Sequence, residues 1–513
     1  MNKPCVYIVG AGPGDPSLIS VRGQRLLEGA DVVVYDHQVP EALLRGARAG
    51  AEQIDVGPAA PRTMDQEAIS ILLAEKVRES KSVVRLKWGD PFVFDSGGKE
   101  ALLLREQGIP FEIIPGIPSA IGGAAYAGIP ITYPGADDVV TFVRGHEGQS
   151  EEAPDVNWSG LAGLGGTIVC YAGARQIEAI AKALIAHGRP GDEPAALVYE
   201  ATTPAQRTIT GTLSTIADVS RVDAPALFVI GRVAALREHL RWFDDRPLFG
   251  RRIVVTRSRE QAGELIEMLQ ERGADAIAAP TIRIAPPEDV DALEDAVHQA
   301  STFDWILFAS GNAVEAFMSR LTQNADVREL KGVRICAVGP GTAARLLRYG
   351  VRADLTPSEY RAEALMDALR TQGPLRGKRV LLPRADIGRD VLLDELRQAG
   401  AEVTDVVAYR TTLAQADGDG GRDIYRMLLD GKIDAVTFTS ASTVRNFAQI
   451  HGAEQAADLL SGTVVASIGP VTAEAAQQLG IRTTVQPERY TIPDLVDALV
   501  DHFRDRKANG RGA

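Results

Sequence analysis

The chain of 513 residues is too long to fold around one hydrophobic core, so we expect several domains. Its composition, 45% hydrophobic and 24% charged, is typical of a globular protein. The formal net charge of -13 argues against nucleic acid or an anionic membrane as the main partner, because both require a basic surface. No apolar run is long enough to cross a bilayer and no apolar leader precedes the first strand, so we expect a cytoplasmic protein.

The cysteines point to structure and not to chemistry. Cys5, Cys170 and Cys336 lie far apart in the chain and lack the spacing of metal ligands. We therefore expect no bound metal, and we expect thiols that lie in hydrophobic cores, as in proteins of a reducing compartment.

Short apolar runs alternate with amphipathic helical stretches along the whole chain. The first two runs are "CVYIVG" from Cys5 and "DVVVYD" from Asp31, and the last two are "DAVTFTS" from Asp434 and "VVASIG" from Val464. Short apolar strands separated by helices indicate mostly parallel sheets that helices cover on both faces. The sequence therefore predicts an α/β fold throughout.

Three stretches mark boundaries between parts of the chain. In "RWFDDRPLFGRR", from Arg241, a helix ends in charged, Pro and Gly residues before a new strand, which predicts a linker over residues 244–250. The Gly- and Pro-rich "PGIPSAIGGAAYAGIPITYPG", from Pro115, predicts a hinge within the first half. The polar, basic end of the chain predicts a disordered tail over residues 504–513.

The first strand runs into a glycine-rich turn, "VGAGPGDP". Gly10, Gly12 and Gly14 resemble a dinucleotide fingerprint, but Asp15 stands where the third glycine of that fingerprint belongs. A carboxylate there would repel a pyrophosphate, and the two prolines each remove an amide donor. The turn instead suits a ligand with hydroxyl or ammonium groups. The alternative is a tight strand-to-helix turn with Asp15 as an N-cap.

The same device recurs later in the first half. In "RLKWGDPFVFDSGGKE", from Arg85, a strand end is followed by Gly89, Asp90 and Pro91 and then by a second glycine pair at a helix start. Two Gly-Asp-Pro turns in one domain are a more specific signal than either alone. Together they predict one binding site at the carboxyl ends of two strands.

The second half contains an internal repeat. "DWILFASGNAVEAF" from Asp304 is echoed by "DAVTFTSASTVRNF" from Asp434, and "CAVGPGTAARLL" from Cys336 is echoed by "ASIGPVTAEAAQ" from Ala466. A third pair of segments places Arg257 and Arg384 at equivalent positions after strands. The repeat predicts two similar α/β lobes with Ser/Thr-rich strand ends, and a ligand cleft between the lobes.

Residues 1–243 resemble the tetrapyrrole methyltransferases, specifically the uroporphyrinogen-III C-methyltransferases. The matching segments include "VGAGPGDP", "VVRLKWGDPFVF", "PFEIIPGIPSA" and "PALFVIG", in the family's order. The resemblance implies two α/β subdomains, about residues 1–117 and 118–243, a homodimer, and S-adenosylmethionine as the cofactor. It implies that the cofactor is bound by Gly10, Gly12, Gly14, Asp15, Gly89, Asp90, Pro91, Ser119 and Ala226.

The chain departs from this family where the tetrapyrrole would bind. His37 and Ser96 stand where the family has arginine, Asp95 and Trp88 stand where it has glycine, and Tyr133-Pro134 replaces His-Arg. Loss of arginines removes charge-assisted contacts to a polycarboxylate substrate. We therefore favour a methyltransferase-like half without turnover. Two alternatives stay open: methylation of uroporphyrinogen III at C2 and C7, and a non-catalytic module that binds S-adenosylmethionine or dimerises.

Residues 251–503 resemble uroporphyrinogen-III synthase, through "IVVTRSREQAGEL", "FDWILFASGNAV", "AVGPGTA", "VAYRTT" and "FTSASTV" in family order. The resemblance implies two lobes, one of about residues 251–284 plus 411–503 and one of about residues 285–410. It also implies that hydroxymethylbilane is closed to uroporphyrinogen III without a cofactor. That reaction is mainly a task of positioning.

The residue types at the repeated strand ends suit that task. Tyr409 matches the family's tyrosine and is the candidate for assisting departure of the hydroxide. The candidate groups for the substrate's carboxylates are Arg257, Ser310, Asn312, Thr342, Arg384, Thr439, Ser440 and Thr472. Each has a plainer interpretation: a strand tyrosine with a satisfied hydroxyl, helix N-caps, or solvated surface arginines.

Overall fold

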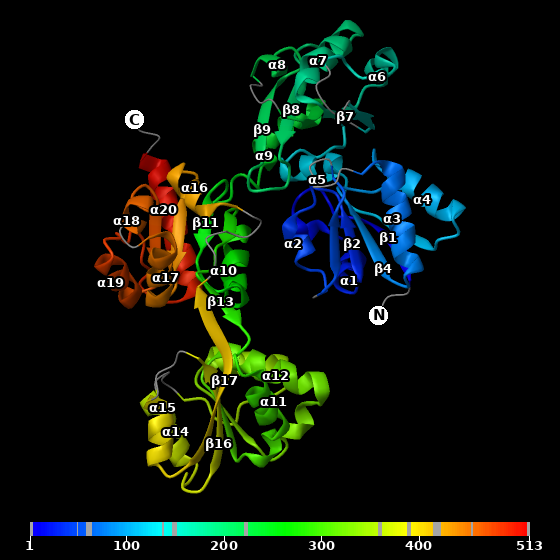
Figure 1. The fold of residues 1–513 in the computed structure, drawn as a ribbon. Helices are drawn as coiled ribbons and strands as arrows, with labels where there is room; N and C mark the ends of the chain where they lie inside the picture. Colours follow the sequence, from blue (N-terminus) through cyan, green and yellow to red (C-terminus); the bar gives the residue numbers. More distant parts are fainter. Residues whose placement is uncertain are drawn as a thin grey trace. The chain divides into compact units, whose positions relative to one another are not determined.

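The computed structural model contains four β-sheets, each with its own helices, along one chain (Figure 1). It describes residues 4–48, 50–57, 64–135, 138–145, 151–219, 224–357, 362–386, 391–413, 422–452 and 455–509. The chain divides into two compact units, one of residues 1–253, 267–276 and 496–513 and the other of residues 254–266 and 277–495.

The first sheet contains five parallel strands in the order β3-β2-β4-β1-β5. Their bounds are β1 Cys5–Gly10, β2 Val32–Tyr35, β3 Glu52–Asp55, β4 Ser82–Lys87 and β5 Phe111–Ile114. Strands β1 and β4 are buried along their whole length, which is why their sequences are nearly continuous apolar runs. This sheet confirms the predicted parallel α/β arrangement.

The second sheet has the order β6-β7-β10-β8-β9 and is mixed. Its strands are β6 Val140–Arg144, β7 Thr167–Ala172, β8 Pro194–Tyr199, β9 Arg207–Thr212 and β10 Ala226–Ile230. The pair β6–β7 is parallel, but β10–β7, β10–β8 and β8–β9 are antiparallel. The prediction of a mostly parallel sheet is wrong here, because a short loop, and not a helix, joins β8 to β9.

Helices cover both sheets of the N-terminal half. The α-helices are α1 Val21–Glu28, α2 Glu41–Leu44, α3 Gln66–Arg78, α4 Gly97–Glu106, α5 Ser119–Tyr126, α6 Trp158–Leu164, α7 Ile177–Ala186, α8 Ile216–Val219 and α9 Arg237–Leu240. Short 3-10 turns are η1 Pro16–Leu18, η2 Ala174–Gln176 and η3 Arg232–Leu236. Helix α5 follows the last strand of the first sheet and lies within the segment from Pro115 to Gly135, for which the sequence predicts a hinge.

Two further sheets form the C-terminal half. The third has the order β12-β11-β18-β19, with β11 Arg252–Val255, β12 Asp275–Ala278, β18 Ala435–Phe438 and β19 Val464–Ser467. The fourth has the order β13-β17-β16-β14-β15, with β13 Ile282–Ala285, β14 Trp305–Phe308, β15 Arg334–Ala337, β16 Arg379–Ala385 and β17 Glu402–Leu413. Strand β13 pairs antiparallel with β17, and the other pairs of the fourth sheet are parallel.

The crossings between these two sheets differ slightly from the predicted lobe boundaries. Ile282 pairs with Leu413, so the whole of β13 and the end of β17 belong to the fourth sheet. The chain therefore enters this sheet a few residues before Ala285 and leaves it after Leu413. The antiparallel pairing with β13 is what extends β17 beyond Thr411.

The helices of the C-terminal half alternate with these strands, as the repeat predicts. Their bounds are α10 Arg259–Glu271, α11 Val290–His298, α12 Gly311–Asn324, α13 Pro340–Arg348, α14 Ala362–Thr371, α15 Val391–Gln398, α16 Ile424–Leu429, α17 Ala441–His451, α18 Ala456–Leu459, α19 Pro470–Gln478 and α20 Ile492–Asn509. Two 3-10 turns, η4 Ala300–Thr302 and η5 Val327–Leu330, flank β14 and β15. The predicted disordered tail is wrong for residues 504–509, where α20 continues because no glycine or proline interrupts it before Gly510. Residues 510–513 lie outside the described part.

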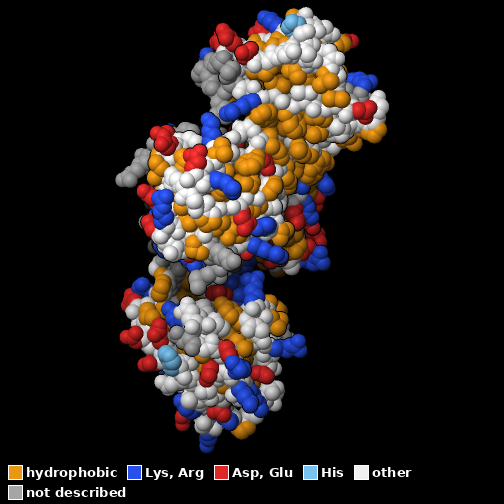
Figure 2. Space-filling model, turned by 90° about the vertical axis from the view of Figure 1, so that its right-hand side faces the viewer, with side chains coloured by type: hydrophobic (Ala, Val, Ile, Leu, Met, Phe, Trp, Pro, Cys, Tyr) orange, Lys and Arg blue, Asp and Glu red, His pale blue; other side chains and the backbone are white. Residues whose placement is uncertain are grey.

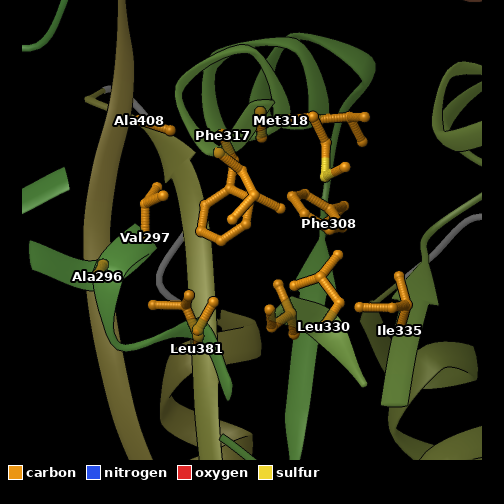
Figure 3. Packing of buried hydrophobic residues seen from close by; sticks show 14 of the residues in the cluster. Ala296, Val297, Phe308, Phe317, Met318, Leu330, Ile335, Leu381 and Ala408 are labelled. Carbon is orange, nitrogen blue, oxygen red and sulfur yellow. The ribbon is translucent and has the colours of Figure 1, made fainter. Parts of the chain in front are cut away.

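Each sheet has its own hydrophobic core. Under the fourth sheet, Phe308 and Phe317 lie edge to face with ring centroids 5.6 Å apart, next to Met318 and Leu381 (Figure 3). The packing fixes α12 against β14 and β16, and with it the strand end that precedes α12. All three cysteines are buried, which confirms the prediction of core thiols.

The predicted linker over residues 244–250 is packed against its neighbours. The side chain of Leu248 is fully buried and its amide donates to the carbonyl of Arg272 at 2.9 Å. The ring of Phe249 lies 5.3 Å from that of Phe243.

On the face shown in Figure 2, acidic and basic side chains are interspersed between hydrophobic areas.

Candidate functional site

The two glycine turns of the N-terminal half meet through their backbones. The amide of Gly12 donates to the carbonyl of Gly89 at 3.2 Å, and the amide of Gly89 donates to the carbonyl of Gly12 at 2.9 Å. Gly89 has a φ of +64°, and a Cβ at Gly10 would lie 2.5 Å from Cα of Gly116. Only glycine permits this approach. The structure thus brings Gly10, Gly12 and Gly89 together.

Gly14 and Asp15 join the two subdomains. The amide of Asp15 donates to Oγ1 of Thr202 at 2.9 Å, and the hydroxyl of Tyr126 donates to Oδ2 of Asp15 at 2.7 Å. Asp15 also accepts from the amide of Ser17 and so caps η1. The N-cap interpretation of Asp15 is therefore confirmed. Burial and the neighbouring Asp15 raise the pKa of Tyr126, so this hydroxyl keeps its proton.

Asp90 ties the second turn to the segment after β5. Its Oδ1 accepts from the amide of Phe92 at 2.8 Å and its Oδ2 accepts from the amide of Gly116 at 2.9 Å. Pro91 packs under the start of α4, where a Cβ at Gly97 would lie 2.3 Å from the carbonyl oxygen of Pro91. Both residues of the predicted cofactor set therefore shape the backbone of the turn.

The remaining predicted cofactor residues lie at α5 and β10. Ser119 begins α5, and its Oγ accepts from the indole N–H of Trp88 at 3.2 Å. Ala226 begins β10 and pairs with Ala172 in β7. The neighbouring Tyr171 accepts from an amide of α5 and lies edge to face with Phe94 of the second turn. Residues of both subdomains thus converge on the start of α5.

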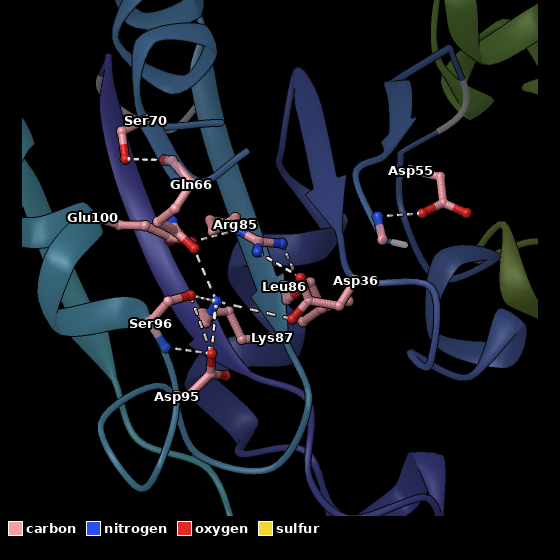
Figure 4. A network of polar contacts seen from close by, with 11 residues as sticks. Asp36, Asp55, Gln66, Ser70, Arg85, Leu86, Lys87, Asp95, Ser96 and Glu100 are labelled. Atoms are coloured by element: carbon pink, nitrogen blue, oxygen red, sulfur yellow. Dashed lines mark hydrogen bonds and ion pairs between the residues drawn. The ribbon is translucent and has the colours of Figure 1, made fainter. Parts of the chain in front are cut away.

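A buried charge network lies beside this site, and the sequence analysis missed it (Figure 4). Arg85 and Lys87 of β4 and Glu100 of α4 are each at most 1% exposed. Glu100 Oε1 lies 3.3 Å from Arg85 Nε and 3.2 Å from Lys87 Nζ, and Arg85 also pairs with Asp36. The sequence contains a signal for this network, because two cations in a strand that is otherwise apolar require buried partners of opposite charge.

The residues that depart from the methyltransferase pattern turn toward the chain's own side chains. Lys87 Nζ lies 3.0 Å from Asp95 Oδ1 and 2.9 Å from Ser96 Oγ, and His37 Nδ1 lies 2.9 Å from Asp55 Oδ2. Burial raises the pKa of Asp95, against the opposing influence of the Lys87 charge. Asp95 and Ser96 therefore belong to the buried network, whereas His37 forms a separate pair with Asp55 and is 55% exposed.

In the C-terminal half, the structure brings Ser310 and Tyr409 together. Ser310 Oγ lies 3.0 Å from the hydroxyl of Tyr409, and it accepts from the amide of Ala313 as the N-cap of α12. Pairing shifts between Arg384 and Ala385, so that Ala385 lies opposite Tyr409. This β-bulge adds one residue to β17 and places two successive side chains, Ala408 and Tyr409, in the core.

The other Ser and Thr candidates lie at helix starts, as the alternative interpretation has it. Ser440 caps α17 by accepting from the amide of Thr443, and Asn312 lies in the first turn of α12. Thr342 and Thr472 are buried in the first turns of α13 and α19, at equivalent places of the repeat. Thr439 precedes the cap of α17. Helix starts also present free amides, so a capping role and an anion-binding role are compatible.

The sequence matches the model of the Uroporphyrinogen-III synthase HemD family over residues 263–497, and that of the Tetrapyrrole (Corrin/Porphyrin) Methylases over residues 5–217. The protein named "Porphyrin biosynthesis protein HemD" from Ruminiclostridium josui is 34% identical over 506 residues, which cover 98% of each chain. The chain belongs to this HemD family. The chain carries a methyltransferase domain fused to a uroporphyrinogen-III synthase domain, which confirms both resemblances.

Two further relatives concern the N-terminal half of the chain. The S-adenosyl-L-methionine-dependent uroporphyrinogen III methyltransferase of Methanosarcina barkeri is 44% identical over 243 residues, or 47% of this chain and 95% of that protein. The solved structure of uroporphyrin-III C-methyl transferase from Thermus thermophilus, complexed with S-adenyl homocysteine, is 38% identical, covers 45% of this chain and 99% of that chain, and has a TM-score of 0.40. No helix in the described part of the chain has both the length and the apolar character that spanning a membrane requires.

The two arginines at equivalent positions of the internal repeat differ in their surroundings. Arg384 forms two hydrogen bonds with the carboxylate of Asp405, at 2.6 and 2.8 Å. Among the described residues, the side chain of Arg257 has only Gln261 as a hydrogen-bond partner, and burial lowers its pKa. Next to it, the hydroxyl of Ser258 is buried and has no hydrogen-bond partner in the described part of the chain.

Proposed function

We propose that the synthase domain closes hydroxymethylbilane to uroporphyrinogen III with inversion of the terminal ring. The observation that carries this proposal is the contact between Tyr409, inside β17, and Ser310, which follows β14, in a chain that aligns over 98% of its length with a HemD protein. The reaction removes one hydroxide and forms one carbon–carbon bond, with no net transfer of electrons to another molecule. It therefore needs no cofactor, and its main requirement is positioning.

The tyrosine is the group that assists departure of the hydroxide. Tyr409 is 8% exposed, so its ring is held by the core and its hydroxyl lies at the edge of that core. A phenol can donate a proton or a hydrogen bond to the leaving hydroxyl of the substrate. It does not attack the carbocation that forms when this hydroxyl departs. The same position would hold the leaving oxygen while the terminal ring turns.

Carboxylate recognition falls to Arg257 and the helix starts. Arg257 is a half-buried cation with no carboxylate within ion-pair distance among the described residues, and its neighbour Ser258 has an unused buried hydroxyl. A buried cation or hydroxyl that has no partner lowers the stability of the fold, unless a ligand supplies the missing partner. A substrate carboxylate supplies both a charge and acceptor oxygens. Arg384, by contrast, is already paired with Asp405.

For the methyltransferase domain, we propose binding of S-adenosylmethionine without methylation of the tetrapyrrole. The residues fit the cofactor because the paired glycine turns leave their backbone open: a Cβ at Gly89 would meet nothing closer than 3.8 Å. When bound, the cofactor supplies an electrophilic methyl group. The substrate side does not fit, because Asp95 and Ser96, which replace glycine and arginine of the family pattern, are held by Lys87 of the protein itself. The full methylation of uroporphyrinogen III is the second candidate, favoured by 44% identity to a methyltransferase.

Replacement of one oxygen tests the synthase proposal. Tyr409→Phe keeps the buried ring and removes the hydroxyl, so we expect kcat for hydroxymethylbilane consumption to fall by about 100-fold or more, with little change in the melting temperature. Uncatalysed closure would then compete, and the product would shift from isomer III toward isomer I. A variant with the wild-type rate and isomer ratio would contradict the role given to Tyr409.

A further inference from the structure

The hydroxyl of Ser310 lies between a helix end and the proposed catalytic tyrosine. It accepts a hydrogen bond from the amide of Ala313 at 3.1 Å, and it lies 3.0 Å from the hydroxyl of Tyr409. Both side chains have fixed positions. Ser310 is the N-cap of α12 with extended backbone, and Tyr409 is anchored by the bulge and by the amide of Asp386, which donates to its carbonyl at 3.1 Å.

The geometry of the contact allows either hydroxyl to donate, and the other contacts of the two groups bear on which one does. A serine hydroxyl has one proton to donate and two lone pairs to accept with. The amide of Ala313 already occupies one lone pair of Ser310. Within the described part of the chain, the proton of the Ser310 hydroxyl has the phenol oxygen of Tyr409 as its hydrogen-bond acceptor. If Tyr409 donated instead, its proton would be spent on Ser310 and none would remain for the substrate.

The repeat provides an internal comparison. Ser440 occupies the place of Ser310 in the other lobe and also caps its helix, by accepting from the amide of Thr443 at 3.2 Å. Its hydroxyl, however, lies 2.9 Å from that of Ser442 in the same helix. Ser310 thus contacts a tyrosine of β17, whereas Ser440 contacts a serine of its own helix. Capping a helix does not by itself require a contact with a tyrosine.

We propose that Ser310 is a positioning residue, and not a contact for the substrate's carboxylates: its hydroxyl donates to the oxygen of Tyr409 and so directs the tyrosine proton toward the leaving hydroxyl. This inference rests on the proposed synthase function. As the substrate's C–O bond breaks, its electron pair stays with the oxygen, which takes the Tyr409 proton and leaves as water. The phenolate keeps the hydrogen bond from Ser310. Ring closure releases one proton from the attacked carbon, and that proton restores Tyr409.

Three variants of the full-length protein separate this role from capping. Ser310→Ala removes both the cap and the donor, whereas Ser310→Thr keeps both. Asp289→Ala removes an exposed cap from α11, next to α12, and provides the control for capping alone. We expect Ser310→Ala to lower kcat for hydroxymethylbilane about 100-fold with KM nearly unchanged. Ser310→Thr should restore most of kcat, and Asp289→Ala should keep the wild-type value.

A double-mutant cycle completes the test. If Ser310 acts through Tyr409, Ser310→Ala should have no further effect on kcat in a Tyr409→Phe background. The inference is overturned if the two substitutions multiply, if Ser310→Ala changes KM and not kcat, or if a folded Ser310→Thr variant stays as slow as Ser310→Ala. Wild-type protein that forms no isomer III would instead overturn the proposed function itself, so the two failures are distinguishable.

Discussion

At the scale of single residues, equivalent positions of the repeat carry different tasks. Arg257 and Arg384 follow corresponding strands, and both are predicted to contact the substrate. In the structure Asp405 pairs with Arg384, whereas Arg257 has no carboxylate of the described residues within ion-pair distance, although the charge of Glu264 acts on it from further away. A guanidinium engaged by two charge-assisted hydrogen bonds is held in place, and one without such a partner is available to a ligand. Of these two arginines, we therefore propose that Arg257 is the one that binds the substrate.

This proposal predicts that one of two matched substitutions changes KM and that the other changes the stability of the fold. Arg257→Ala should raise KM for hydroxymethylbilane by about 10-fold or more, which is the loss of about 1.5–3 kcal/mol for a hydrogen bond to a charged group, and should leave the melting temperature unchanged. Arg384→Ala should leave KM unchanged and lower the free energy of unfolding by about 1–3 kcal/mol, because Asp405 keeps a half-buried charge without its partner. Steady-state kinetics and thermal unfolding of both variants measure these effects. Equal changes in KM for the two would contradict the assignment.

The positions of these residues could be predicted from the sequence, but their partners could not. The Ser/Thr-rich strand ends and the repeat were sufficient to identify Ser310 and Ser440 as equivalent positions. The contact of Ser310 with Tyr409 depends on a β-bulge, and no residue pattern in "VVAYRTT" marks one. Asp95 and Ser96 were recognised as departures from a family pattern, while their contact with Lys87 depends on how α4 packs beside β4.

At the scale of elements, β4 and α4 are joined by charges where an apolar contact would be usual. Glu100 in α4 is fully buried against Arg85 and Lys87 of β4, and Gln66 donates to it at 2.8 Å. Burial by itself would raise the pKa of Glu100, but the charges of Arg85 and Lys87 outweigh it and lower the pKa. A carboxyl whose pKa is lower in the folded state stabilises the fold above its unfolded pKa, and this stabilisation is lost on acidification.

We therefore predict that Glu100→Gln destabilises the protein in a pH-dependent way. At neutral pH the variant should lose about 3–5 kcal/mol of unfolding free energy, because two buried cations lose a shared anion. The difference from wild type should shrink as the pH falls below 4.5, the ordinary pKa of glutamate, because Glu100 of the unfolded chain binds its proton there and Glu100 of the folded protein binds its own at still lower pH. Glu106→Gln, at an exposed position of the same helix, is the control and should match wild type throughout. Denaturant unfolding followed between neutral and acidic pH measures both, and a difference that grows on acidification would contradict the ion-pair account.

Element types were largely predictable because burial dictates the apolar pattern, and the errors have specific causes. The second sheet was expected to be mostly parallel, but the short loop between β8 and β9 leaves no room for a crossover helix. The end of α20 was expected to be disordered from its polarity, whereas the residues up to Asn509 are compatible with a helix. Polarity alone does not distinguish an exposed helix end from a disordered tail.

At the scale of the whole molecule, a synthase domain and a methyltransferase domain share one chain, and the account gives them unequal roles. We predict that the full-length protein binds labelled S-adenosylmethionine at equilibrium and that saturating cofactor raises the melting temperature of the methyltransferase domain, because a ligand of the folded state stabilises it by mass action. Transfer of label to uroporphyrinogen III should not follow. Equilibrium dialysis combined with calorimetry measures binding, and an absence of binding at millimolar cofactor would contradict this part of the account.

The most direct test of the central claim is the product that the purified protein forms from fresh hydroxymethylbilane in the presence of labelled S-adenosylmethionine. After oxidation, the products are separated by isomer and by methylation state, with a protein-free control for spontaneous closure. The account predicts isomer III without label. Labelled product would overturn the role given to the methyltransferase domain, and isomer I alone, as in the control, would contradict the synthase function itself.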